Sequence, residues 1–100
     1  MQDKFEMRIL AEYNRRFKQL EVVGKKAGRL KDLNMTKEAK EVRNHFELLL
    51  SEIEAYYKKY RQTLVKYGVL PQYPLEIELS EDEKDTAISW QRQHSRKHGI

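Results

Sequence analysis

The residues with the clearest potential for metal chemistry are two histidines near the end of the chain. His94 and His98 stand four residues apart, a spacing that places two imidazoles on one face of a helix. Zinc in proteins needs three or four ligands, and the chain has no Cys and no acidic residue after Asp85. We therefore expect neither a metal site nor a cofactor.

Catalytic combinations are equally sparse. The acidic residues between 76 and 85 are close in sequence, but nothing in the pattern implies the burial that would separate their pKa values. Serine and threonine residues lack a histidine and an acid at the spacing of a known relay, and no glycine-rich phosphate loop occurs. The sequence predicts that the protein is not an enzyme.

Six positively charged residues, which we call the basic row, recur along the first part of the chain at intervals of 4, 7, 3, 7 and 4. They are Lys4, Arg8, Arg15, Lys18, Lys25 and Arg29. At 100° per residue they share one helical face, opposite the apolar residues, and no acid joins that face before Asp32. A face of one sign attracts phosphate or an acidic partner, although an ordinary solvated helix surface is the alternative interpretation.

A second basic region follows in residues 56–61, where the order is Tyr-Tyr-Lys-Lys-Tyr-Arg. Lys58, Lys59 and Arg61 belong to a stretch without any acid between Ala55 and Leu75. Aromatic rings interleaved with cations are typical of surfaces that bind single-stranded nucleic acid. Packing of the tyrosines in a core is the competing interpretation, because they fall on or beside the apolar stripe.

Two long helical patterns must position these groups. Residues 4–33 and 35–67 each carry an apolar stripe at spacings of three and four, and a connection this short favours antiparallel packing. We expect an all-α fold: a long antiparallel hairpin, an extended arm and a short C-terminal helix, in a three-helix or dimeric bundle. Residues 1–68 would form the hairpin and residues 69–100 the arm and last helix, within one domain.

Several residues mark where the helices begin and end. Asp3 with Glu6 has the spacing of a capping box, and Thr36 is a candidate N-cap for the second helix. That helix should continue to Gly68, which can adopt a left-handed conformation. Gly24 and Gly28 interrupt the first helix, so its last turns are either frayed or kinked, or closely approached by another backbone.

The C-terminal third has an extended segment before its helix. Residues 75–79 alternate strictly between apolar and acidic, so they form an arm on the hairpin or pair with a strand of a second copy or partner. Ser80 with Glu83 forms a second capping box that opens a helix near residues 81–97. Trp90 should dock on the open side of the hairpin.

A two-helix hairpin cannot cover stripes this wide. Candidate residues for a protein interface are Leu50, Tyr57, Leu64, Leu75, Ile77, Leu79 and Trp90. We therefore expect a non-enzymatic interaction module that self-associates as a homodimer, with a coiled-coil character, or docks on another protein. The alternative is a nucleic-acid-binding protein that uses the basic row, and a third hypothesis has acidic residues 76–85 covering that row or mimicking phosphate toward a basic partner.

Composition bounds the class of protein. The net charge is +4, cysteine is absent, and no apolar run approaches the length of a membrane span. The first residues do not resemble a signal peptide. We expect a soluble intracellular protein, cytoplasmic or nuclear if eukaryotic, without a small-molecule substrate.

Overall fold

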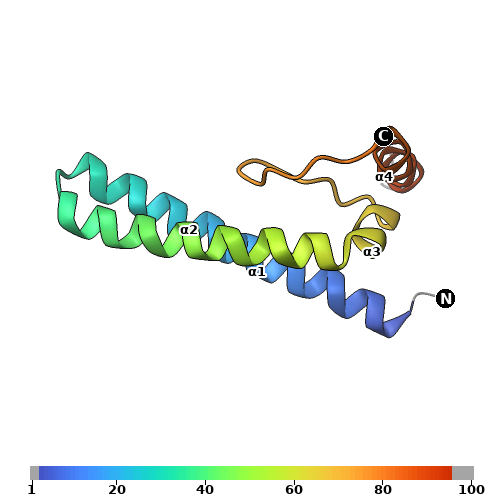
Figure 1. The fold of residues 1–100 in the computed structure, drawn as a ribbon, viewed down its shortest axis with the longest axis horizontal. Helices are drawn as coiled ribbons and strands as arrows, with labels where there is room; N and C mark the ends of the chain where they lie inside the picture. Colours follow the sequence, from blue (N-terminus) through green and yellow to red (C-terminus); the bar gives the residue numbers. More distant parts are fainter. Residues whose placement is uncertain (1–2, 96–100) are drawn as a thin grey trace.

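The computed structural model describes residues 3–95 and confirms the all-α prediction (Figure 1). Helix α1 spans Lys4–Asp32, α2 spans Thr36–Lys59, α3 spans Arg61–Lys66 and α4 spans Glu81–Ser95. No strand occurs within the described residues.

Helices α1 and α2 form the expected antiparallel hairpin, and the longest dimension of the molecule is 49 Å (Figure 1). The side chain of Asp3 accepts a hydrogen bond from the Phe5 amide at 2.7 Å, which caps the start of α1. At the other end Asn34 adopts a left-handed conformation, with φ of 59°. The Met35 amide then bonds back to the Leu30 carbonyl at 3.0 Å, so the turn satisfies a carbonyl that the helix leaves open.

The first helix is continuous to Asp32 despite its glycines. At Gly24 a Cβ would lie 3.0 Å from the ring of Phe46, so the missing side chain lets a ring of α2 approach. Gly28 faces open space instead. At these two glycines the helix therefore shows neither of the predicted effects, which were fraying and the close approach of another backbone. Two smaller predictions about the helix starts were also wrong. Met35, and not Thr36, is the N-cap of α2. Glu6 does not complete a capping box with Asp3, because its carboxylate bonds to Lys66 and Tyr67 instead.

The second helix does not run unbroken to Gly68, as the sequence pattern indicated. It stops at Tyr60, with φ of −110° and ψ of 27°, and α3 begins in a new direction. Leu64 and Val65, both on α3, are buried in the core. The prediction for Gly68 is confirmed: it ends α3 with φ of 78°, and the Val69 amide bonds to the Leu64 carbonyl at 2.9 Å.

Residues 68–80, which lead into α4, form an extended arm that lies on the hairpin. Leu75 and Leu79 are buried and Ile77 is half-buried against the core, so the expected packing of the arm is confirmed. The Glu76 amide also donates a hydrogen bond to the Glu54 carboxylate at 3.3 Å, which ties the arm to α2.

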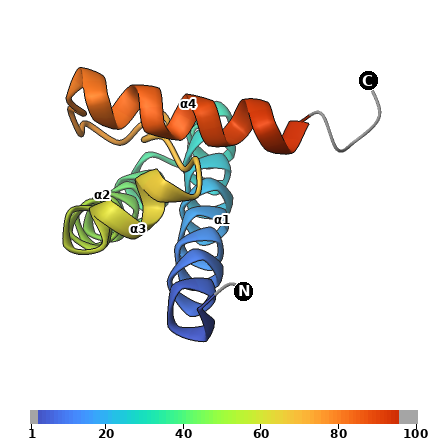
Figure 2. The ribbon, with the colours of Figure 1, turned by 90° about the vertical axis from the view of Figure 1, so that its right-hand side faces the viewer.

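Helix α4 begins at the predicted capping box. The Ser80 hydroxyl accepts from the Glu83 amide at 3.2 Å, and the Glu83 carboxylate accepts from the Ser80 amide at 2.9 Å. The helix crosses the end of the hairpin instead of lying along it, and α3 is the helix it packs against (Figure 2). The single chain is therefore not a bundle of three long rods.

The buried core occupies one half of the hairpin. Its members come from α1, α2, α3, the arm and α4: Ile9, Tyr13, Leu20, Ile53, Tyr57, Leu64, Val65, Leu75, Leu79 and Ala87. We call this part the covered half. Residues 21–52, which include the turn between the helices, contain no buried residue and form the open half.

Candidate interaction surfaces

The open half carries an apolar row that no other element covers. Its members are half-buried between the two helices: Val23, Ala27, Leu30, Ala39, Val42, Phe46, Leu49 and Leu50. Each of the two helices covers one side of the apolar residues that the other helix contributes to this row. In Figure 1 neither the arm nor α4 extends along this part of the hairpin. The row is therefore an apolar feature that the fold leaves partly exposed.

A shallow groove of about 570 Å³ runs along the open half. We call it the distal groove, and it is lined by Ala27, Gly28, Lys31, Thr36, Ala39, Lys40, Arg43, Asn44 and Glu47. Small residues form its floor, because Gly28 has no side chain and alanines flank it on both helices. Three cations and one carboxylate line it, so the distal groove is positive.

The distal groove continues the face on which the arm lies. Glu54 bonds to the arm, and Glu47, Arg43 and Lys40 follow it at helical spacings of seven, four and three. On α1, Phe17 lines a hollow beside the arm, and Gly28 lies eleven residues further along the same side. One continuous face is thus occupied by the arm in the covered half and empty in the open half.

All six members of the basic row are exposed, as their spacing predicted. Arg15 donates to Glu12 at 2.6 Å, whereas within residues 3–95 the other five form no ion pair. The acidic residues 76–85 do not lie over this row: within residues 3–95 the one ion pair that joins them to an earlier part of the chain is between Glu83 and Arg61 of α3. The hypothesis of an internal acidic cover is therefore wrong.

Another groove, of about 520 Å³, opens where α1 begins and α2 ends. We call it the aromatic groove, and it is lined by Phe5, Arg8, Ile9, Ala11, Glu12, Arg15, Tyr56 and Tyr60. The Tyr56 hydroxyl donates to the Ile9 carbonyl at 3.2 Å, which fixes one wall. Lys59 lies 5.3 Å from the centroid of the Tyr60 ring. Lys58 is also exposed, but it projects from α2 in a direction 100° away from that of Lys59.

Phe5 is the member of this groove that the sequence patterns missed. The residue is 61% exposed, and it lies outside the arc of the main apolar stripe. Its spacing of four from Ile9 was the available signal, because residues at i and i+4 share one side of a helix.

Two carboxylates have a strongly lowered pKa because arginines hold them. Arg15 donates a hydrogen bond to Glu12 and Arg16 adds another, which lowers the pKa of Glu12 to about 2. Both partners are on α1, so this cluster holds no second element in place. Burial by contrast raises the pKa of Tyr13 to about 12, and its hydroxyl has no partner among the described residues.

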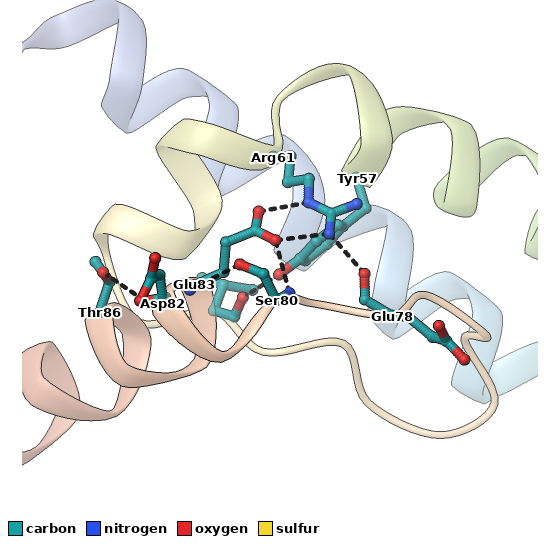
Figure 3. A network of polar contacts seen from close by, with 8 residues as sticks. Tyr57, Arg61, Glu78, Ser80, Asp82, Glu83 and Thr86 are labelled. Carbon is teal, nitrogen blue, oxygen red and sulfur yellow. Dashed lines mark hydrogen bonds and ion pairs between the residues drawn. The ribbon is translucent and has the colours of Figure 1, made fainter.

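Arg61, a predicted member of the basic surface, is instead engaged within the molecule (Figure 3). Its guanidinium donates to the Glu83 carboxylate at 2.7 Å and to the Glu78 carbonyl at 2.6 Å. Arg61 and Ser80 together lower the pKa of Glu83 to about 2. This network fastens α3 to the start of α4 and removes Arg61 from the candidate binding residues.

The predicted protein-interface residues serve mainly the internal core. Tyr57 and Leu64 are fully buried, and the Tyr57 hydroxyl donates to the Val69 carbonyl. Leu75 and Leu79 are buried with them, whereas Leu50 and Ile77 keep partial exposure. In the covered half, the arm and α3 cover the apolar stripe that we expected a partner to cover. The surface available to a partner therefore lies in the open half.

Trp90 packs near the end of the hairpin and not on its open side. Its ring meets Tyr67 edge to face at a centroid distance of 6.0 Å and stacks on His94 at 3.6 Å. Gln91 adds a hydrogen bond to the Gly68 carbonyl at 2.6 Å. His98, the second histidine of the predicted pair, lies outside the described residues, and residues 3–95 contain no cluster of three side chains suited to a metal.

Comparison with known proteins gives no match: neither a family model, nor a curated protein, nor a solved structure is similar to this chain. Among the described helices none combines the length and apolar character needed to cross a membrane. The class of protein is therefore defined by its architecture, an all-α helical hairpin whose covered half is closed by an arm and two short helices.

Proposed function

We propose that this protein is a non-enzymatic assembly module that forms a homodimer through the distal groove. The single observation that carries the proposal is the uneven burial of the hairpin. Among the residues that the structure describes, ten apolar side chains are buried outside residues 21–52 and none is buried within that range. A long two-helix rod gains most of its stability when a further element covers its apolar row.

Charge favours a second copy as the occupant. The distal groove carries Lys31, Lys40 and Arg43, and the same chain carries exposed acids at Glu81, Asp82 and Asp85. In one molecule these regions lie apart, because Arg61 and the packing on α3 hold the start of α4 at the other end of the hairpin (Figure 1). Two copies arranged about a twofold axis would bring each acidic segment to the groove of its partner.

The test is the mass in solution, measured by light scattering at low and high salt. We expect twice the chain mass of 12.1 kDa at low salt, and partial dissociation as salt screens the charges. A monomer at high concentration and low salt would contradict the proposal. A complex that forms only with a different protein would point to a heterologous partner.

Paired charge reversals make the test specific. Lys40→Glu with Arg43→Glu makes the groove acidic, and Glu81→Lys with Asp82→Lys makes the helix start basic. Each double variant alone should be monomeric, whereas an equal mixture should form heterodimers, because both contacts are then complementary. Lys37→Glu is the matched control, since Lys37 is exposed on the same helix and does not line the groove.

A second candidate function, nucleic-acid binding, is favoured by the basic row. Five exposed cations without an ion pair in the described part of the chain follow one side of α1, away from the distal groove. Their span, from residue 4 to residue 29, is about 37 Å. Affinity that falls steeply with added salt would support this function, and absent or salt-independent binding would remove it.

A further inference from the structure

We infer that the aromatic groove binds a segment of single-stranded nucleic acid, with bases stacked on Phe5 and Tyr60 and phosphates held by Arg8 and Lys59. This inference rests on the second candidate function above and adds to it the form of nucleic acid. The basic row alone would hold phosphates of a duplex and of a single strand alike.

The first argument is the arrangement of three rings from two helices. Phe5 and Tyr60 meet edge to face, with centroids 6.4 Å apart, and Tyr56 lies 4.8 Å from Tyr60. Phe5 lies in the first turn of α1, and most of the residue is exposed. An exposed ring beside a groove gives a flat apolar surface of the kind on which unpaired bases stack, whatever their sequence.

The second argument is the charge around these rings. Arg8 and Arg15 line the aromatic groove, and Lys59 lies against Tyr60. Glu12 is the one carboxylate among the lining residues, and it is already shared between Arg15 and Arg16. The groove is therefore positive at its rim and aromatic along its wall, which matches a strand with an anionic backbone and apolar base faces.

The third argument is continuity. Arg8 belongs both to the aromatic groove and to the basic row, so the row extends from the groove along α1 toward Arg29. A strand anchored by its bases at the start of α1 would find further cations along the helix. A duplex keeps its bases stacked on one another and can use only the cations.

The experiment compares an oligonucleotide of about twelve nucleotides, a length within the usual range of single-strand site sizes, with a duplex of equal length by fluorescence anisotropy. We expect the full chain to prefer the single strand. Phe5→Leu removes the ring but keeps an apolar side chain, and it should weaken single-strand binding about tenfold while leaving duplex binding unchanged. Tyr73→Leu is the control, because Tyr73 is 94% exposed and lies on the arm.

A charge variant separates base stacking in the aromatic groove from phosphate binding by the basic row. Arg8→Gln should weaken both ligands, whereas Lys37→Gln, which removes an exposed charge outside the row, should weaken neither. Equal affinity for both ligands together with an unaffected Phe5→Leu variant would overturn the stacking inference and leave phosphate binding in place. Absence of binding to either ligand would remove both.

A measurement on the unaltered chain covers the case in which Phe5→Leu fails to fold. Photocrosslinking with a single strand that contains bromouracil, followed by mass spectrometry, should attach the base to Phe5 or Tyr60. Crosslinks confined to the arm, to α4 or to the open half would contradict the inference.

Discussion

The two halves of the hairpin use the same kind of helix surface in different ways. In the covered half, Tyr57, Leu64 and Ala87 have no exposed surface, since the arm, α3 and α4 close over them. In the open half, Phe46 and Leu30 remain half-exposed although they belong to the same apolar stripes. The difference teaches that the closed part of the rod is the part on which the arm packs, and the arm reaches only part of the rod's length.

The largest contrast is expected from two leucines of the same helix. Leu20 is 1% exposed in the covered half, so Leu20→Ala should cost about 3 kcal/mol in the free energy of unfolding. Leu30 is half-buried in the open half, and Leu30→Ala should cost about 1 kcal/mol, because its site is already open to water. Urea denaturation at a concentration where the chain is monomeric measures both, and equal costs would contradict the division into two halves.

Two glycines should respond to alanine with opposite signs. Gly68 has φ of 78°, and a Cβ there would lie 2.8 Å from the Trp90 ring, so Gly68→Ala should cost about 2 kcal/mol. Gly28 lies within α1 and faces open space, so Gly28→Ala should add about 1 kcal/mol. Thermal unfolding monitored by circular dichroism gives both values. A loss of stability at Gly28 would mean that the groove floor is already closely packed.

The smallest effect concerns the pH dependence of the link between α3 and α4. The pKa of Glu83 falls from 4.5 to about 2 on folding, so its stabilisation is present above pH 4.5 and is lost as the pH falls toward 2. Glu83→Gln should reduce this acid-dependent fall in the unfolding midpoint, followed by Trp90 fluorescence. Part of the fall should remain in that variant, because the pKa of Glu12 is also lowered to about 2.

The sequence predicted those parts of the fold that depend on neighbouring residues. The Ser80 and Glu83 capping box, the left-handed Gly68 and the shared face of the basic row all follow from spacings within one or two helical turns. Local rules fix them, because a cap or a helical face involves only residues close in sequence.

The partners of the long side chains could not be predicted in this way. Arg61 lies 22 residues from Glu83, and the aromatic groove joins Phe5 to Tyr60 across the whole hairpin. The break at Tyr60 decides the contact of Arg61, because it turns α3 away from α2, whereas the antiparallel register of the hairpin brings Phe5 beside Tyr60. A continuous apolar pattern through residue 67 gave no signal for that break.

What the sequence alone determined is a pair of amphipathic, antiparallel rods with one basic face. What only the tertiary structure decided is which part of the rods remains open. The physical reason is that apolar periodicity states which residues must leave water but not what will cover them. That choice depends on where the arm and α4 lie, and here they cover the half of the hairpin opposite the turn.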